Sequence, residues 1–393
     1  MLRGANIVVL SSIDWSFNRQ NPQEVAAAFA ESGNRVLFVE NTGVRRATLR
    51  DLPRLWVRLR NWWHARGGTE HTAGGVDVLS PLLLPFPYAR AAALVNTRLL
   101  ARAVRRWMRG ARGGPLIVIT FLPTPLARAL IGALKPDLVV YYCIDRLAES
   151  SRGARRLIES EPKLLAEADL VLVTSTGLYE FAGNSRRVEM LESGVRMEEF
   201  ERALAERAKP HPAFAGVSGP VAGFVGSLRG STDLALLAEA AALAPEITFM
   251  LVGPAFADLG ALRALPNVRI AGAVPHPEVM KYMVRFDAGV LPYVLNRFTS
   301  DIMPVKLKEY LAAGLPVVAT PLPEVRRFAD EHPGMIEFAS DAGELVAALR
   351  SAVRQRPADV AQRMDVARGF DWKSQTKRMS ELIESALRPL SPL

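Results

Sequence analysis

Two charged residues in the second half of the sequence, Lys306 and Glu309, are spaced so that their side chains could bind one ligand together. The pattern around them predicts a helix at 304–313, with Pro304 in its first turn, where a missing N–H costs nothing, and Gly314 in the left-handed position that ends it. Residues three apart share a helix face. A helix N-terminus beside a lysine suits a pyrophosphate, and a nearby carboxylate can accept hydrogen bonds from a ribose diol. The pair is therefore either a nucleotide site or an ordinary Lys–Glu pair on a surface helix.

A second acid stands just before this helix. Asp301 lies eight positions before Glu309, and either Ser300 or Asp301 is expected to cap the helix. After the helix, Pro316 opens a run that reads as a buried strand.

The elements that must position these residues alternate along the chain. Short β-branched runs alternate with longer amphipathic stretches, which predicts parallel sheets covered by helices on both faces. The alternation stops at about 206–219, where Pro210 and Pro212 favour a linker. We therefore expect two doubly wound Rossmann-like domains, at 1–205 and 220–370, followed by a charged helix within 371–393.

Composition supports two globular domains and excludes several other classes. The chain has 393 residues, which is too long for one ordinary hydrophobic core. Of these residues 49% are hydrophobic and 23% charged, as in soluble globular proteins. The single cysteine, Cys143, excludes an internal disulfide and fits a reducing compartment. No apolar run approaches the ~20 residues that cross a bilayer. The sequence also lacks an Asp-x-Asp pair, an HExxH motif, a G-x-S-x-G elbow and a Walker loop.

The net charge of +9 is concentrated in one segment. Residues 44–113 hold fourteen arginines and three acids, a larger surplus than that of the whole chain, so the remainder is slightly acidic. A nucleic-acid-binding protein would be basic more uniformly, and we expect no nucleic-acid partner. The pattern indicates a local cationic face instead.

Part of this segment, 52–63, interleaves arginine with tryptophan and leucine. As a helix it would carry an apolar face beside a cationic one, which is typical of helices that lie in a membrane interface. The alternative is a covering helix with snorkelling arginines. The residues concerned are Arg54, Trp56, Arg58, Arg60, Trp62 and Trp63.

Several strings resemble family-4 (group 1) glycosyltransferases of the GT-B fold. The string PVKLKEYLAAGLPVVATPLPEV, at 304–325, is similar to the donor-site signature, in which two glutamates are spaced E-x7-E; Glu309 matches the second and Asp301 replaces the first. Further strings resemble family motifs in the expected order: Ala168–Val171 with Thr174–Ser175, Leu191–Val195 with Phe200, Phe224–Leu228, and Leu251–Gly253.

The resemblance implies two Rossmann-like domains that face each other across a cleft, with the final helix crossing back to the first. It implies transfer, with retention and without a metal, of a sugar from a nucleotide diphosphate sugar to a glycan or lipid-linked acceptor in cell-surface polysaccharide synthesis. No other cofactor is implied. Asp301, Glu309 and Asp145 become the candidate catalytic residues. The candidate donor-binding residues are Gly226, Ser227, Arg229, Gly253, Pro304, Val305, Lys306 and Glu309.

The roles of three first-domain residues stay open. Asp145 either contacts a sugar or the acceptor, or caps the following helix; Asp14 and Trp15 either touch the acceptor or belong to a structural loop. We expect a cytoplasmic enzyme, peripheral on the inner face of the cell membrane. The alternatives are a GT-B nucleotide-sugar epimerase and a non-catalytic subunit of a polysaccharide assembly complex.

Overall fold

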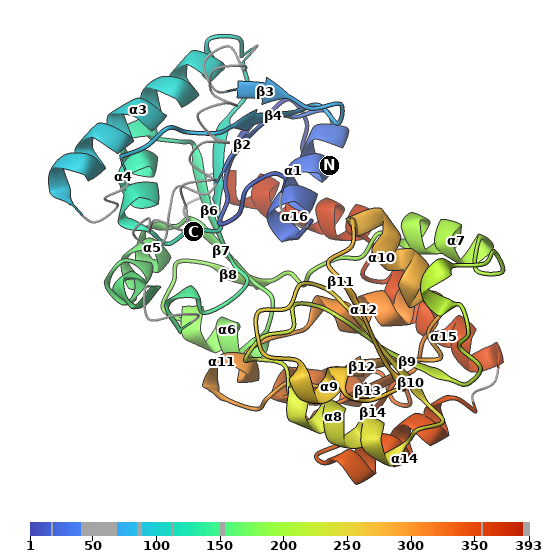
Figure 1. The fold of residues 1–393 in the computed structure, drawn as a ribbon. Coiled ribbons are helices and arrows are strands. Elements are labelled where there is room, and N and C mark those ends of the chain that lie inside the picture. Colours follow the sequence, from blue (N-terminus) through green and yellow to red (C-terminus); the bar gives the residue numbers. More distant parts are fainter. Residues whose placement is uncertain are drawn as a thin grey trace. The chain divides into compact units, whose positions relative to one another are not determined.

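The computed structural model of the chain describes residues 1–16, 19–40, 69–84, 89–111, 113–149, 154–354 and 357–387. They belong to two compact units (Figure 1), one formed by Met1–Glu192 with Lys373–Leu393 and the other by Ser193–Trp372. In these ranges no helix combines the length and the apolar character needed to span a bilayer.

The first unit is built on a sheet of eight strands in the order β3-β4-β2-β1-β5-β6-β7-β8. All neighbours are parallel except β3 and β4. The strands are β1 (Asn6–Leu10), β2 (Arg35–Val39), β3 (Thr69–His71), β4 (Val76–Leu79), β5 (Leu116–Thr120), β6 (Leu138–Cys143), β7 (Leu170–Val173) and β8 (Val188–Met190).

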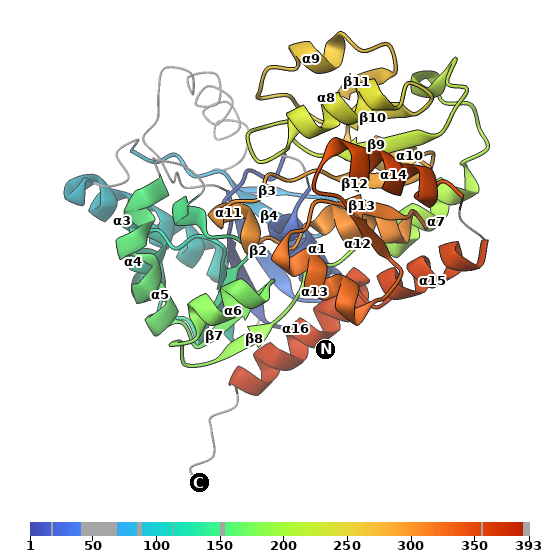
Figure 2. The same cartoon turned by 90° about the horizontal axis from the view of Figure 1, so that it is seen from below.

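Helices cover this sheet, and α3 and α4 lie side by side over it (Figures 1 and 2). Their buried residues form one apolar cluster with β1, β2 and β5. The helices are α1 (Asn21–Glu31), α3 (Arg90–Met108), α4 (Pro125–Leu134), η2 (Leu147–Glu149), η3 (Ala154–Glu159), α5 (Glu161–Glu167), α6 (Thr176–Ala182) and α16 (Trp372–Leu387).

The second unit is built on a six-stranded, fully parallel sheet in the order β11-β10-β9-β12-β13-β14. With the first sheet, it confirms the predicted pair of Rossmann-like parallel-sheet domains. The strands are β9 (Val221–Val225), β10 (Thr248–Val252), β11 (Val268–Gly272), β12 (Ala288–Leu291), β13 (Val317–Ala319) and β14 (Ile336–Phe338).

Strand residues of this sheet alternate between two apolar clusters. Val221 and Val225 of β9 belong to one cluster, with α7, α10, α12 and α13, whereas Ala222 and Phe224 belong to the other, with α8, α9 and α14. The sheet is therefore doubly wound, as expected. The helices are α7 (Met197–Ala205), η4 (Pro212–Phe214), α8 (Leu234–Leu243), α9 (Gly260–Arg263), α10 (His276–Met283), α11 (Arg297–Ser300), α12 (Val305–Ala312), α13 (Pro323–Glu331), α14 (Ala342–Ala352) and α15 (Pro357–Arg368).

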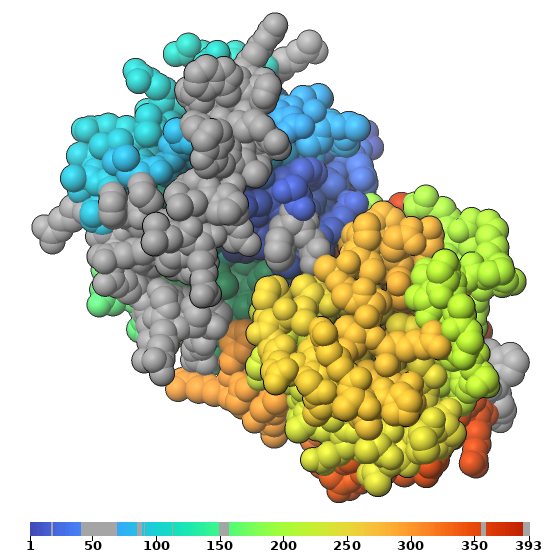
Figure 3. All heavy atoms as spheres, viewed as in Figure 1, coloured from blue at the N-terminus to red at the C-terminus, as the bar shows by residue number. Residues whose placement is uncertain are grey.

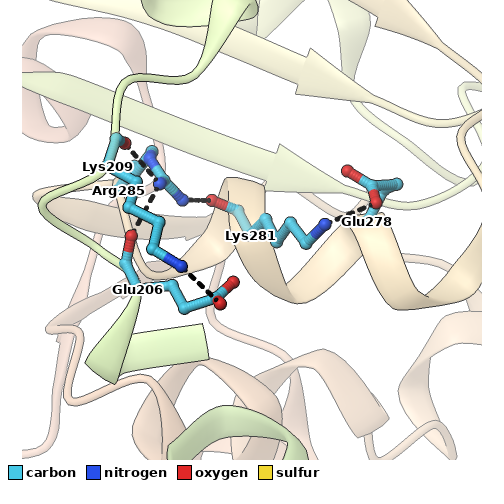
Figure 4. A network of polar contacts seen from close by, with 5 residues as sticks. All are labelled: Glu206, Lys209, Glu278, Lys281 and Arg285. Carbon is cyan, nitrogen blue, oxygen red and sulfur yellow. Dashed lines mark hydrogen bonds and ion pairs between the residues drawn. The ribbon is translucent and has the colours of Figure 1, made fainter. Parts of the chain in front are cut away.

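The predicted linker, 206–219, lies inside the second unit, because the units divide after Glu192. Figure 4 shows how its first residues are held on α10. The Arg285 guanidinium donates hydrogen bonds to the carbonyl oxygens of Glu206 (3.1 Å), Lys209 (2.8 Å) and Lys281 (2.6 Å). Two lysine–glutamate pairs flank it, Lys209–Glu206 and Lys281–Glu278. The proline-rich composition thus marks an irregular segment that is packed onto its own domain.

Two local expectations differ from the structure. The amphipathic pattern at 154–168 predicts one helix, but the structure has a 3-10 turn, η3, followed after Ser160 by α5, with Pro162 in the first turn of α5. The short strands β3, β4 and β14 are not predicted from the sequence; they pair with β4, β2 and β13, respectively.

Candidate functional site

The carboxyl ends of β9 and β10 meet in two glycine turns. Gly226 N donates to the carbonyl oxygen of Val252 at 2.9 Å. Gly253 has φ +143°, and a Cβ there would lie 1.9 Å from the carbonyl oxygen of Gly226. Only glycine permits this contact without a shift of the backbone. The carboxyl edge of such a sheet is where parallel α/β domains bind ligands, so the turns give a ligand direct access to the backbone.

The residues after Gly226 form a short loop at the same edge. The Ser227 carbonyl accepts a hydrogen bond from the Thr232 hydroxyl at 3.2 Å, and the Arg229 carbonyl accepts one from Thr232 N at 2.8 Å. Ser227 is half-buried, whereas Arg229 is exposed. The Arg229 side chain is therefore accessible to a ligand.

Helix α12 begins without a side-chain cap. Its N-cap is Pro304, whose side chain has no atom that can accept a hydrogen bond from the first turn of the helix. The prediction that Ser300 or Asp301 caps this helix is wrong, because Asp301 instead ends the preceding helix α11 as its C-cap. The N-cap side chain therefore does not satisfy the first-turn amides, including that of Val305, and a helix N-terminus of this kind favours an anion.

Lys306 and Glu309 lie on one face of α12 and bind each other, with 2.5 Å between Nζ and Oε2. Their side chains are 26% and 15% exposed, so both are partly shielded from water while remaining accessible. Asp301, half-buried, lies on the separate element α11. The helix predicted at 304–313 also ends as expected, since Gly314 has φ +75°.

Tyr310 ties α12 to the strand ends. Its buried hydroxyl accepts a hydrogen bond from Val225 N at 2.9 Å and points toward the Val290 carbonyl at 3.5 Å. Its ring packs over Gly289, where a Cβ would lie 2.5 Å from the ring. Burial raises the pKa of the Tyr310 phenol, so it stays neutral. Because Val225 immediately precedes Gly226, this contact sets α12 relative to the glycine turn.

Replacing Tyr310 with phenylalanine should lower the stability and weaken nucleotide binding together. The change leaves the buried Val225 N–H without a partner, which costs about 1–3 kcal/mol. Thermal unfolding and calorimetric titration with nucleotide measure the two effects. The matched control is Tyr282→Phe, since Tyr282 is also a buried tyrosine of the second unit but its hydroxyl makes no hydrogen bond to the residues that the structure describes. Equal effects of both variants would contradict the positioning role.

Lys308, on the same helix, was not singled out from the sequence. It is fully buried, donates to the Ser193 carbonyl at 3.2 Å and lies 4.1 Å from the centre of the Phe370 ring. The same two segments are also joined by main-chain hydrogen bonds like those between strands: Val195 N donates to Phe370 O and Trp372 N donates to Val195 O, both at 2.9 Å. Lys308 therefore holds two distant segments of the second unit on α12. Lysine is rarely buried, so no sequence signal pointed to it.

Asp145 belongs to the first unit, whereas the other candidate catalytic and donor-binding residues belong to the second. It is half-buried just after β6, and its carbonyl accepts hydrogen bonds from Leu147 N at 2.9 Å and from the Cys143 thiol at 3.8 Å. Burial raises the pKa of the Cys143 thiol, which makes it a core residue rather than a nucleophile.

The loop after β1 is tied down by Glu40, which the sequence did not single out. This buried carboxylate accepts from Trp15 N at 2.9 Å and from the Ser80 hydroxyl at 2.6 Å. The Trp15 ring packs edge-on against Phe38, with 5.0 Å between centroids. Trp15 thus has a structural role in this loop, whereas Asp14 is half-buried beside it.

In the described ranges, no group of three or more His, Cys, Asp or Glu side chains is arranged to hold a metal ion. The second unit thus offers main-chain amides, Arg229, Lys306 and Glu309 at its candidate site. This set is chemically suited to a phosphate group and a diol.

Comparison with known proteins agrees with this arrangement. Residues 219–355 match the family described as "Glycosyl transferases group 1". A Bacillus subtilis (strain 168) protein, provisionally named as the teichuronic acid biosynthesis glycosyltransferase TuaH, is 30% identical over 258 residues. That match spans 60% of this chain and 64%, less than two thirds, of TuaH.

Solved structures match along nearly the whole chain. Sucrose-phosphate synthase from Thermosynechococcus elongatus has a TM-score of 0.70 at 16% identity, covering 97% of this chain and 98% of its own. Anabaena HepE in complex with UDP and glucose has a TM-score of 0.68 at 14% identity, covering 97% and 100%. The chain therefore has the GT-B fold, and residues 219–355, within its second unit, are similar to the group 1 glycosyltransferase family.

Proposed function

We propose that the chain is a metal-independent, retaining glycosyltransferase, which moves a sugar from a nucleotide diphosphate sugar to a glycan or lipid-linked acceptor in cell-surface polymer synthesis. One observation carries the proposal: an uncapped helix N-terminus with a Lys306–Glu309 pair, which Tyr310 ties to the glycine turn at the end of β9. The relatives add support, since TuaH is assigned to teichuronic acid synthesis and HepE binds UDP and glucose.

Each group has a distinct task in this proposal. Glu309 accepts hydrogen bonds from the ribose hydroxyls, and the turn at Gly226 and Gly253 lets the donor approach the backbone. When the bond between the anomeric carbon and the diphosphate oxygen breaks, negative charge grows on the leaving group. The α12 amides, Lys306 and Arg229 offer positive potential to that charge, which removes the need for a metal.

Three parts of the proposal concern the first unit and the surroundings. Asp145 is assigned to the acceptor sugar, on its position at the carboxyl end of a strand. A peripheral position on the inner face of the cell membrane fits a lipid-linked acceptor. The segment 52–63, predicted to bind anionic membrane, lies outside the residues that the structure describes.

Incubating the purified chain with a panel of nucleotide-sugar donors should release nucleoside diphosphate from one of them. We expect an acceptor to stimulate the release and EDTA to leave it unchanged, because the described site relies on amides and basic side chains. Nucleotide release is measured by a coupled assay, and the anomeric configuration of the product by NMR.

The alternatives predict different products. An epimerase would return an isomerised sugar without acceptor dependence, and a non-catalytic subunit would bind donor without releasing nucleotide. Complete loss of turnover in EDTA, restored by magnesium or manganese, would contradict the metal-independent mechanism.

A further inference from the structure

The exposed face of α3 in the first unit is both apolar and cationic, and neither property is used by the proposed function. Leu94 is 52% exposed, Leu99 46% and Val95 40%. Arg98, Arg102, Arg105, Arg106 and Arg109, along the same helix and at its end, are exposed as well. Their spacing places all eight side chains on one continuous face, which we call the α3 face. Figure 3 shows part of this segment, in light blue and cyan, at the molecular surface.

The opposite face of α3 is fixed in the core, so the orientation of the helix is determined. Leu100, Val104 and Trp107 are buried. The Trp107 indole donates a hydrogen bond to Asp77 Oδ2 on β4 at 2.6 Å, and the Arg35 guanidinium lies 4.3 Å from the centre of its ring. The leucines of the α3 face therefore cannot turn inward without breaking these contacts.

A neighbouring loop extends the apolar part of the α3 face. The buried Asn96 side chain accepts a hydrogen bond from Leu84 N at 2.9 Å and donates one to its carbonyl at 3.1 Å. This pairing holds Leu84, itself 44% exposed, beside the first turns of α3. The apolar side chains of the α3 face thus lie between Leu94 and Leu99, with Arg98 among them, and from Arg102 onward the face carries only arginines.

Charge complementarity selects the partner. Helix α3 contains no acidic residue, so its arginines are not neutralised from within the helix. Two copies of the chain would bring arginines against arginines, which disfavours a dimer through this face. A soluble polyanion would satisfy the arginines and leave the leucines in water. An anionic lipid surface satisfies both, with headgroups on the arginines and the leucines entering the acyl boundary.

We propose that the α3 face docks the first unit onto anionic lipid bilayers. This surface is distinct from the segment at 52–63 and is defined by residues that the structure describes. This inference rests on the proposed function in one respect only: membrane docking would bring the enzyme to a lipid-linked acceptor. Donor binding in the second unit is measured separately, so failure of one does not imply failure of the other.

The test measures sedimentation of the full chain with vesicles of phosphatidylcholine alone or mixed with phosphatidylglycerol. We expect binding only to the anionic vesicles, weakening as salt is raised. The variant Arg98→Glu, Arg102→Glu, Arg106→Glu should lose at least about 100-fold in partition, since each arginine near such a surface contributes about fivefold. Calorimetry with nucleotide should give unchanged affinity.

Two matched variants complete the design. Arg202→Glu, Arg207→Glu, Arg378→Glu changes the net charge equally at exposed positions elsewhere and should retain binding. Leu94→Ser with Leu99→Ser keeps every charge and should weaken binding to anionic vesicles. The proposal would be overturned if both triple variants lost vesicle binding equally, or if the leucine changes had no effect. It would also be overturned if dextran sulfate competed with the vesicles while the leucine variant still bound them as the unchanged protein does.

Discussion

Replacing Glu309 with glutamine should lower the affinity for nucleotide by about 10- to 150-fold, while the protein remains folded. The substitution keeps the shape of the side chain and removes the charge that accepts from the ribose and pairs with Lys306 at 2.5 Å. Hydrogen bonds to a charged group contribute about 1.5–3 kcal/mol, which sets the expected range. Calorimetric titration with nucleoside diphosphate is the measurement.

The second unit offers a matched control for this variant. Glu278 forms a similar pair with Lys281, three residues away on α10, at 2.7 Å (Figure 4). Glu278→Gln removes the same charge from an i,i+3 pair outside the candidate site and should leave nucleotide affinity unchanged. If Glu309→Gln binds nucleotide as tightly as Glu278→Gln does, the donor site has been placed wrongly.

Replacing Gly253 with alanine should disrupt the donor site and destabilise the second unit by about 3 kcal/mol or more. The new Cβ would lie 1.9 Å from the Gly226 carbonyl oxygen, and the residue would hold φ near +143°. The steric overlap and the backbone strain each cost roughly 1–3 kcal/mol. A lower midpoint of thermal unfolding and loss of nucleotide binding are expected together.

Gly272→Ala separates the two causes. Gly272 also has a positive φ, +71°, but nothing lies within 4 Å of a Cβ built there. This variant should cost only the conformational penalty of about 1–2 kcal/mol and should retain nucleotide binding. An equal loss of binding in Gly272→Ala would show that strain at the sheet edge, rather than the contact between the turns, governs the site.

Much of the second unit could be predicted from local sequence. The apolar run at 221–225 predicts a strand, and the structure has β9 there with the same bounds; Gly314 ends α12 as expected. Such signals are local, since they depend on side-chain branching, apolar runs and the conformational freedom of glycine. The strands β3, β4 and β14 are not predicted from the sequence, because strands of three or four residues gain their stability from a neighbouring strand.

The start of α12 shows where local signals mislead. Ser300 and Asp301 are good capping residues by type, but the chain forms the separate helix α11 there, and Pro304 takes the N-cap position of α12. The type of a residue states which cap it can form, whereas the path of the backbone decides which helix it serves.

The sequence by itself determined that this protein has two parallel-sheet domains and a lysine–glutamate pair on one helix face, because periodicity and spacing are properties of the chain alone. Only the tertiary structure decided that Lys308 is buried, that Tyr310 sets the helix against the glycine turn, and that Leu94 and Leu99 of α3 are exposed. The physical reason is that each depends on partners far away in sequence. Phe370 and Ser193 for Lys308, and Val225 for Tyr310, come within reach only when the chain is folded.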